Sequence, residues 1–207
     1  PTFACEHTKR AWTAMSGQFL SEEQRDALQE VLNISMGQAA DALARLIQTQ
    51  VHLSIPSVVQ SSCQDFIGRL KEPVQQHLAQ QSFLGELSGE MISLMTDNGN
   101  EAIARLMHYD VPLPEQDRQE LLLELTNILA GACLHGLISQ LNFKIQLAAP
   151  VLLNPASLRS EQLNWQQALL MEVQFQIPET SFHARILICL KQDSLYPLMH
   201  HLDMLLQ

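Results

Sequence analysis

The feature that most constrains the fold of this chain is a polar motif that occurs twice. The segments "EVLNISMGQA" and "ELTNILAGAC" both read E-x-x-N-I-x-x-G. Asn33 precedes Asn127 by 94 positions, and Pro56 precedes Pro150 by the same 94 positions. In each copy 22 residues separate the asparagine from the proline. This constant offset predicts an internal duplication into two halves rather than a solenoid of many repeats.

Each half is predicted to contain the same order of elements: a long helix, a strand, a variable segment, two strands and a helix. The first long helix is predicted to run from Ser21, whose S-x-x-Q box can cap a helix N-terminus, to about Gln50. The second is predicted to start near Pro114, after the linker "DVPLPEQD". The other predicted elements are a strand at 51–59, a hairpin at 82–95, a helix at 100–109, strands at 143–153, 170–177 and 182–190, and a helix from about 193. Residues 61–80 are ambiguous.

One stripe of each long helix carries the repeated polar residues, because positions i, i+4, i+7 and i+11 share a face at about 100° per residue. The two predicted stripes are Asp26, Glu30, Asn33 and Gly37 in the first helix, and Glu120, Glu124, Asn127 and Gly131 in the second.

The apolar side of the first helix is predicted to face the core, opposite its stripe, so that the carboxylates and amides face water. The residues predicted on that apolar side are Leu28, Leu32, Met36, Ala39, Leu43, Leu46 and Ile47.

Two of the stripe residues disfavour helix formation, which suggests a purpose other than folding. Asparagine has poor helix propensity, and glycine costs roughly 1 kcal/mol relative to alanine. The missing side chain at Gly37 and Gly131 would let the backbone of another protein approach the helix. The repeated stripes therefore predict a docking surface.

The chemistry open to a glutamate and an asparagine on such a stripe is incomplete by itself. A carboxylate can pair with a lysine of a partner, and an amide can orient a water molecule for attack on a phosphoryl group. The electrophile and any metal would then belong to the partner. The sequence contains no G-x-x-x-x-G-K-[ST], G-x-S-x-G or H-E-x-x-H motif that would indicate a self-sufficient site.

Composition excludes several other classes of function. A formal charge of −10 disfavours nucleic acid as a partner, and no stretch of about 18 residues lacks charged or amide side chains, so no membrane insertion is expected. The four cysteines are far apart, which favours a cytoplasmic location over a disulfide framework or zinc site. Cys133 and His135 are expected on different faces of their helix, which argues against a Cys–His nucleophile pair.

The pattern [D/S]-x-x-x-E-x-x-N followed after 22 residues by P resembles the signature of the CheC/CheX/FliY family. These are chemotaxis phosphatases that dephosphorylate the response regulator CheY. Asp26, Glu30, Asn33 and Pro56 match the whole signature, whereas the second copy opens with Glu120 in place of Asp or Ser. The likeness covers about residues 20–206, and its two copies resemble CheC more than CheX.

The resemblance implies an α+β fold with a CheC-like internal duplication, in which two long pseudo-twofold-related helices pack on a shared antiparallel sheet. It implies an N-terminal tail at 1–19 and a single CheC-like domain at 20–207. Within that domain, repeat one would cover about 20–109 and repeat two about 114–206.

The resemblance also implies an aspartyl-phosphate phosphatase, a hydrolase acting on a phosphorylated CheY-type receiver domain. Glu30 and Glu124 would pair with the receiver's lysine, and Asn33 and Asn127 would orient the attacking water. The chain itself would bind no cofactor, and Mg²⁺ would be held by the receiver. A CheD-like deamidase is a further expected partner in some lineages. The alternative function is a non-catalytic adaptor that binds a receiver or a CheD-like protein and sequesters it.

Overall fold

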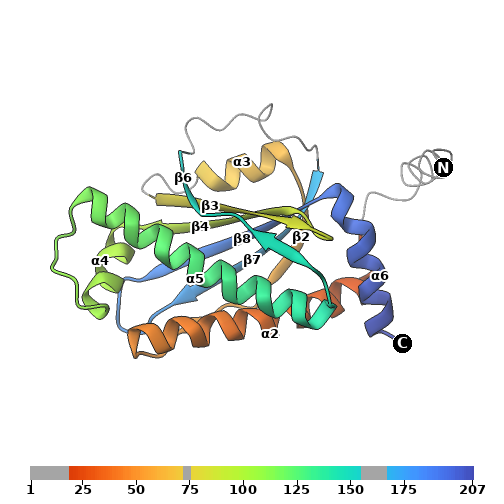
Figure 1. Cartoon of the computed structure of the whole chain (residues 1–207), viewed down its shortest axis with the longest axis horizontal. Coiled ribbons are helices and arrows are strands. Elements are labelled where there is room, and N and C mark those ends of the chain that lie inside the picture. Colours follow the sequence, from red (N-terminus) through yellow and green to blue (C-terminus); the bar gives the residue numbers. More distant parts are fainter. Residues whose placement is uncertain (1–18, 72–75, 155–166) are drawn as a thin grey trace.

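The computed structural model describes residues 19–71, 76–154 and 167–207. The predicted tail at 1–19, apart from Phe19, and most of the variable segment of the second half lie outside these residues. Figure 1 shows the long helices α2 and α5 side by side on one face of a sheet, with the short helix α3 on the opposite face. The helices are α2 (Glu22–Ile47), α3 (Cys63–Lys71), α4 (Asp97–Leu106), α5 (Glu115–Leu141) and α6 (Leu195–Leu205), with a 3₁₀ turn η2 at Gln192–Ser194.

The two long helices begin as their sequences predict. The Ser21 hydroxyl accepts from the Gln24 backbone N–H at 3.1 Å, and the Gln24 side chain accepts from the Ser21 N–H at 3.0 Å, which completes the predicted capping box. Helix α5 has Pro114 at its N-cap. Each long helix ends at a residue in the left-handed conformation, Gln48 and Asn142 respectively.

The eight-stranded sheet is antiparallel throughout its described pairings. The predicted strand at 51–59 is interrupted at Pro56, and the Gln-rich segment that was ambiguous in sequence forms α3 and the first half of β3. The strands are β1 (His52–Leu53), β2 (Ser57–Ser62), β3 (Gln76–Gly85), β4 (Gly89–Thr96), β5 (Ile145–Leu147), β6 (Val151–Leu153), β7 (Gln167–Gln176) and β8 (His183–Lys191).

The strands that follow each long helix cross over to the other half of the chain. Strands β1 and β2 pair with β7, whereas β5 and β6 pair with β3. The β3–β4 and β7–β8 hairpins meet at the centre, where β4 pairs with β8. Each half therefore completes the sheet of the other, and the predicted shared antiparallel sheet is confirmed.

The register confirms the pseudo-twofold relation between the halves. Its axis passes between Ile92 and Leu187, which pair with each other across β4 and β8. Moving outward from this pair, the successive partners are Gln80 and Val151 on one side and Glu172 and Ser57 on the other. Ser57 and Val151 are 94 positions apart, which is the offset of the two motifs. The α+β fold with two equivalent long helices is therefore confirmed.

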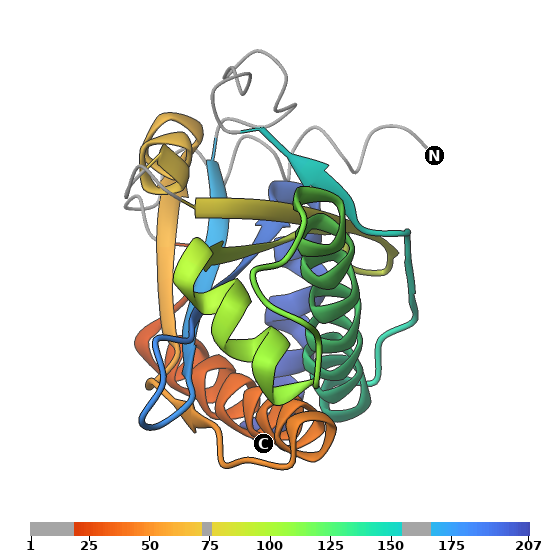
Figure 2. The ribbon, with the colours of Figure 1, turned by 90° about the vertical axis from the view of Figure 1, so that its left-hand side faces the viewer.

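The main core lies between the sheet and the layer formed by α2, α5, α4 and α6 (Figure 2). Helices α2 and α5 pack closely at Gly136, where an added Cβ would lie 2.7 Å from the Ser35 Cα atom. Gln140 ties the same two helices together, since its Nε2 donates to the Val31 carbonyl at 3.0 Å and to the Ser35 hydroxyl at 2.9 Å. The spacing of the two long helices is thus set by small residues and a shared hydrogen bond.

One apolar residue of α2 and the composition of α5 differ from what the sequence predicts. Leu46 was predicted in the core but is 39% exposed, because it lines an open hollow between the C-terminal ends of α2 and α4, whereas the adjacent Ile47 is buried in the core. Helix α5 is long and apolar enough by composition to cross a membrane, although its sequence was not expected to do so. Its apolar side chains pack against α2 and the sheet, as in a core helix.

Candidate functional site

The eight residues of the two predicted stripes lie on the outer faces of α2 and α5. We call Asp26, Glu30, Asn33 and Gly37 stripe 1, and Glu120, Glu124, Asn127 and Gly131 stripe 2. Seven of them are exposed, and Gly131 is half-buried. Most residues one or two positions away from a stripe residue are buried or half-buried. Each stripe is therefore a narrow exposed face on a helix whose other sides pack against the core.

The two motif carboxylates are available to a partner. The side chains of Glu30 and Glu124 make no ion pair or hydrogen bond with any other residue in the described ranges. Glu120, the departure from the family pattern, accepts a hydrogen bond from Gln116 Nε2 at 3.1 Å along its own helix. Each stripe therefore presents one free carboxylate one turn before its asparagine.

The stripe glycines have no packing role within the described chain. A Cβ atom at Gly37 or Gly131 would meet nothing within 4 Å. Gly136, in contrast, is required by the close approach of α2. Since nothing intramolecular needs glycine at the two stripe positions, they fit the expectation of a surface that another backbone approaches.

The two asparagines differ in their surroundings. Asn127 Oδ1 accepts a hydrogen bond from Gln81 Nε2 at 3.0 Å, and the same nitrogen donates to the Ala148 carbonyl at 2.8 Å. Gln81 lies in β3 and is 1% exposed. The Asn33 side chain has no hydrogen bond to any described residue. The Asn127 amide is therefore fixed by a hydrogen bond from the sheet, whereas no hydrogen bond from a described residue fixes the Asn33 amide.

The proline segments are anchored by different glutamines in the two halves. Gln29 Nε2 donates to the Pro56 carbonyl at 2.9 Å, which ties α2 to the start of β2 one turn before Asn33. The equivalent position on α5 is Leu123, which has no polar side chain to repeat this bond. In the second half, the Gln81 bond to Ala148 anchors the corresponding segment instead.

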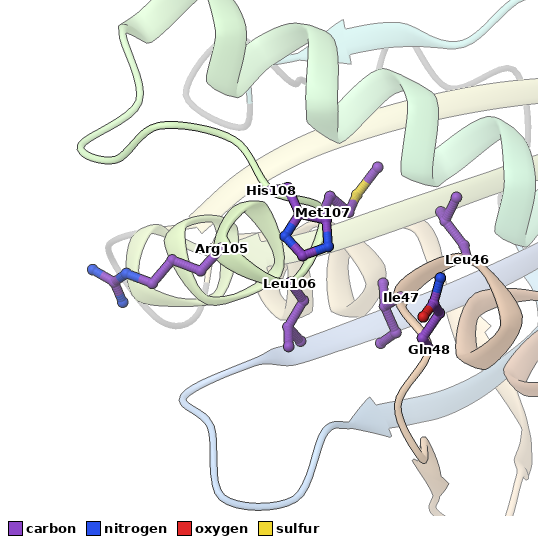
Figure 3. Close-up of a pocket in the computed structure, with 7 residues that line it drawn as sticks. All are labelled: Leu46, Ile47, Gln48, Arg105, Leu106, Met107 and His108. Atoms are coloured by element: carbon purple, nitrogen blue, oxygen red, sulfur yellow. The ribbon is translucent and has the colours of Figure 1, made fainter.

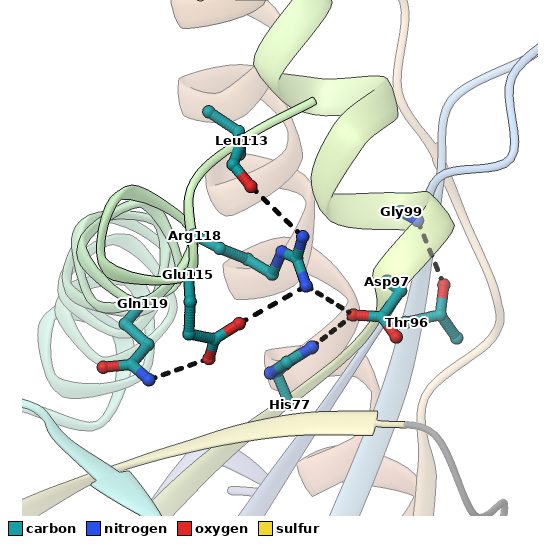
Figure 4. A network of polar contacts seen from close by, with 8 residues as sticks. All are labelled: His77, Thr96, Asp97, Gly99, Leu113, Glu115, Arg118 and Gln119. Carbon is teal, nitrogen blue, oxygen red and sulfur yellow. Dashed lines mark hydrogen bonds and ion pairs between the residues drawn. The ribbon is translucent and has the colours of Figure 1, made fainter. Parts of the chain in front are cut away.

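A polar network fixes the first turn of α5, from which stripe 2 begins (Figure 4). The Arg118 guanidinium lies 3.3 Å from the Asp97 carboxylate and 3.4 Å from Glu115, and it donates to the Leu113 carbonyl at 3.2 Å. His77 on β3 contacts the same carboxylate of Asp97. These contacts join the N-termini of α4 and α5 to the sheet.

The stripes lie apart from a hollow at one end of the helix layer. That hollow, of about 320 Å³, lies between the C-terminal ends of α2 and α4 (Figure 3). No stripe residue lines it; its lining is Leu46, Ile47, Gln48, Arg105, Leu106, Met107 and His108. The stripes are convex helix surfaces, which suits contact with a protein better than enclosure of a small molecule.

Other candidate chemistry is not supported by the described residues. Cys133 is buried between α5 and α2, with its sulfur 3.1 Å from Met36 Sδ, and burial raises the pKa of its thiol. A thiol of this kind is protonated and inaccessible, so it is no nucleophile. Within the described ranges, no group of three or more His, Cys, Asp or Glu side chains could hold a metal ion.

Sequence reasoning missed Gln81. The residue fell between the ambiguous Gln-rich segment at 61–80 and the predicted hairpin at 82–95. Its signal is the alternation Ala79, Gln81, Phe83, in which a polar residue occupies a position between two buried apolar ones. Extending the hairpin pattern by three residues would have placed this side chain on the helix-facing side of the sheet.

Comparisons with known proteins agree with the fold and the motif. Residues 23–59, which contain stripe 1 and Pro56, match the model of the CheC-like family. The CheY-P phosphatase CheC of Bacillus subtilis (strain 168) is 29% identical over 143 residues. This alignment covers 63% of the chain and 66% of that relative, so the chain spans just under two thirds of the relative's length.

Solved structures extend the likeness over more of the chain. FliY of Thermotoga maritima superposes with a TM-score of 0.68 at 17% identity, covering 90% of this chain and 99% of that one. The FliM middle domain of H. pylori gives 0.66 at 10% identity, covering 88% and 99%. CheX in the CheX–CheY–BeF3–Mg²⁺ complex of Borrelia burgdorferi gives 0.54 at 13% identity, covering 79% and 97%. The duplicated motif, the crossed-over sheet and these matches lead to one conclusion: the chain is similar to CheC-like proteins in its first motif, and to CheX, FliY and the FliM middle domain in its fold.

Proposed function

We propose that this chain is a protein phosphatase for the aspartyl phosphate of a CheY-type receiver domain. The observation that carries the proposal is the duplicated exposed stripe, in which a free carboxylate, an amide and an open glycine follow one another along one helix face. The relative named as a CheY-P phosphatase and the CheX structure containing CheY support the same partner class.

In the proposed reaction, Glu30 or Glu124 pairs with a lysine of the receiver and sets the docking register. Asn33 or Asn127 then holds a water molecule in line with the phosphorus atom. The water oxygen attacks phosphorus and the bond to the aspartyl oxygen breaks. The receiver carboxylate is regenerated, and inorganic phosphate is released with the proton of the water. Mg²⁺ held by the receiver would neutralise charge on the phosphoryl oxygens.

The remaining stripe residues are proposed to shape the docking surface. Asp26 and Glu120 open the two stripes, and Gly37 and Gly131 close them with space for the partner backbone. We propose a cytoplasmic location, since chemotaxis receivers act there. A CheD-like deamidase is proposed as a further partner.

The second candidate function is a non-catalytic adaptor that binds and sequesters a receiver or a CheD-like protein. The likeness to the FliM middle domain favours it, because the same fold occurs there in a protein that is not named for an enzymatic activity. An adaptor would act in stoichiometric amounts, whereas a phosphatase turns over.

The test is phosphate release from a phosphorylated, Mg²⁺-loaded CheY-type receiver with substoichiometric amounts of this protein. We expect multiple turnovers, and a fall of roughly 100-fold or more in the Asn33→Ala, Asn127→Ala double variant while receiver binding persists. Asn98→Ala, an exposed helical asparagine outside both stripes, is the matched control. Binding without any acceleration of release would instead establish the adaptor.

A second pair of substitutions tests docking separately from chemistry. Glu30→Lys with Glu124→Lys places like charge against the receiver's lysine, so binding should be lost. Glu22→Lys with Glu23→Lys, two exposed glutamates in the first turn of α2, controls for the same change in net charge. Normal binding by the double charge-reversal variant would refute the docking role of the two glutamates.

A further inference from the structure

We infer that Gln81 is a positioning residue for stripe 2, which holds the Asn127 amide in one orientation before a receiver arrives. The inference rests on the proposed function, since it concerns how one of the two sites presents its water-orienting group. Stripe 1 has no such device. The pairing of a buried strand glutamine with an exposed helix asparagine therefore makes the two sites inequivalent.

The position of Gln81 is set by the alternation of β3. Ala79 and Phe83, two residues to either side, belong to the core between the sheet and the long helices. Gln81 points to the same side and reaches the outer part of that layer, where its Nε2 meets both Asn127 Oδ1 and the Ala148 carbonyl. Its side chain thus bridges α5 to the segment before β6.

These two contacts determine the orientation of both amides. A backbone carbonyl only accepts, so the Gln81 atom beside Ala148 must be the NH₂ group rather than the oxygen. An NH₂ group only donates, so the Asn127 atom that faces it must be Oδ1. Asn127 Nδ2 is therefore the amide atom that does not face Gln81. The Ala148 carbonyl sets the orientation of an exposed amide through one intermediate side chain.

A fixed amide is better suited to orienting water than a rotating one. Asn127 Oδ1 accepts one hydrogen bond from Gln81 and keeps a second lone pair for a water hydrogen. Nδ2 keeps both of its hydrogens for the receiver. Because the side-chain rotation is restricted before docking, less freedom is lost in the transition state.

The first half of the chain offers the internal comparison. In the register, Gln80 corresponds to Glu172, so the next residue, Gln81, corresponds to Val173. A valine cannot donate a hydrogen bond. Asn33 accordingly has no hydrogen bond from its side chain to any described residue, and its amide is free to rotate.

Gln81 is also a residue that folding alone does not explain. Its Oε1 atom is buried and has no hydrogen-bond partner among the described residues. Leaving a buried acceptor unpaired costs stability, and the equivalent position manages with valine. A polar side chain that is only half satisfied at a 1% exposed position suggests a role in presenting Asn127.

The test isolates each site with a parent variant. Asn33→Ala leaves stripe 2, and in that parent we expect Gln81→Met to lower kcat roughly five- to tenfold with KM within about twofold. Methionine conserves the size of the side chain and removes the donor. In the Asn127→Ala parent, Gln81→Met reports general damage to the fold, and the fall in kcat should be much smaller. Gln80→Met, on the opposite side of the same strand, is the matched control.

The outcomes separate this inference from the proposed function. Loss of all turnover in both parents before Gln81 is altered would refute the two-site phosphatase itself. Turnover in the Asn33→Ala parent that is unchanged or raised by Gln81→Met would overturn the role of Gln81 alone. An equal fall in both parents would also overturn it, since that is the result of a structural role.

A measurement on the unaltered protein keeps the inference falsifiable if Gln81→Met does not fold. Side-chain ¹⁵N relaxation reports the mobility of the asparagine NH₂ groups on the ps–ns timescale. We expect an ordered Asn127 side chain and a mobile Asn33 side chain. Equal mobility of the two would overturn the inference without reference to any activity.

Discussion

Stripe 1 and stripe 2 carry the same motif on equivalent helices, but different parts of the molecule support them. Stripe 1 is supported from its own helix, where Gln29 ties α2 to the Pro56 carbonyl. Stripe 2 is supported from the sheet, where Gln81 contacts both Asn127 and Ala148. The same surface residues can therefore be presented with different rigidity. In a duplicated fold, the layer beneath a site distinguishes the copies when the site itself does not.

The largest effect is expected from a substitution that changes the spacing of α2 and α5, because these helices carry both stripes. Gly136→Ala would place a Cβ 2.7 Å from Ser35 Cα, so α2 and α5 must separate. We expect a loss of about 1–3 kcal/mol in the free energy of unfolding, measured with urea. Gly68→Ala, with nothing within 4 Å of its added Cβ, is the control and should not destabilise the protein. An unchanged stability would show that the helix spacing is not set by Gly136.

The next prediction compares the two asparagines one at a time. Asn127→Ala should lower phosphate release from a saturating receiver about tenfold, because the pre-oriented amide carries most of the turnover. Asn33→Ala should lower it by no more than about twofold. Equal effects, or a larger effect at Asn33, would mean that a fixed amide has no advantage over a free one.

A smaller effect is expected at the anchor of the first half. Gln29→Met removes the hydrogen bond to the Pro56 carbonyl, which should cost about 0.5–1.5 kcal/mol in thermal or urea unfolding. Leu123→Met is the matched change at the equivalent position of α5, where no such bond exists, and it should be close to neutral. If both substitutions cost the same, the bond from Gln29 does not support the first half.

The smallest effect is expected at the two stripe glycines. Gly37→Ala and Gly131→Ala should each raise stability by roughly 0.5–1 kcal/mol, since alanine favours the helix and has free space there. Each should also weaken receiver binding, measured by calorimetric titration, because the new methyl group faces the partner. A variant that gains stability and keeps its affinity would show that the partner does not approach that glycine closely.

The sequence was most informative about features that repeat. The long helices, the capping box at Ser21 and the exposure of Glu30 and Asn33 all follow from helical periodicity and the 94-residue offset. Leu46 was misplaced because periodicity does not indicate where the neighbouring elements leave a hollow beside the apolar side of a helix. The crossing of β2 and β6 between halves could not be predicted from local pattern, since strand pairing is decided by residues more than 100 positions apart in the case of β2.

The role of Gln81 could not be predicted from the sequence for a related reason. Its role depends on where β3 lies relative to α5. In the sequence these two elements are separated by β4, α4 and the linker. Glutamine is rarely buried in a strand, but only the contact with Asn127 indicates what Gln81 does. The exposed residues of the two stripes were therefore predictable from the sequence, whereas the hydrogen bond from Gln81 to Asn127 was not.

The crossing of the strands between the halves has a consequence for how this chain folds. His52 pairs with Gln176, so a loop of more than 120 residues must close before the first edge of the sheet forms. Pairings of such high sequence separation give a high contact order, which slows folding. The first half, once it has left the ribosome, lacks the partner strand for its own β2. Folding should therefore wait for synthesis of the C-terminal strands, and neither half alone should form a stable, cooperatively unfolding unit.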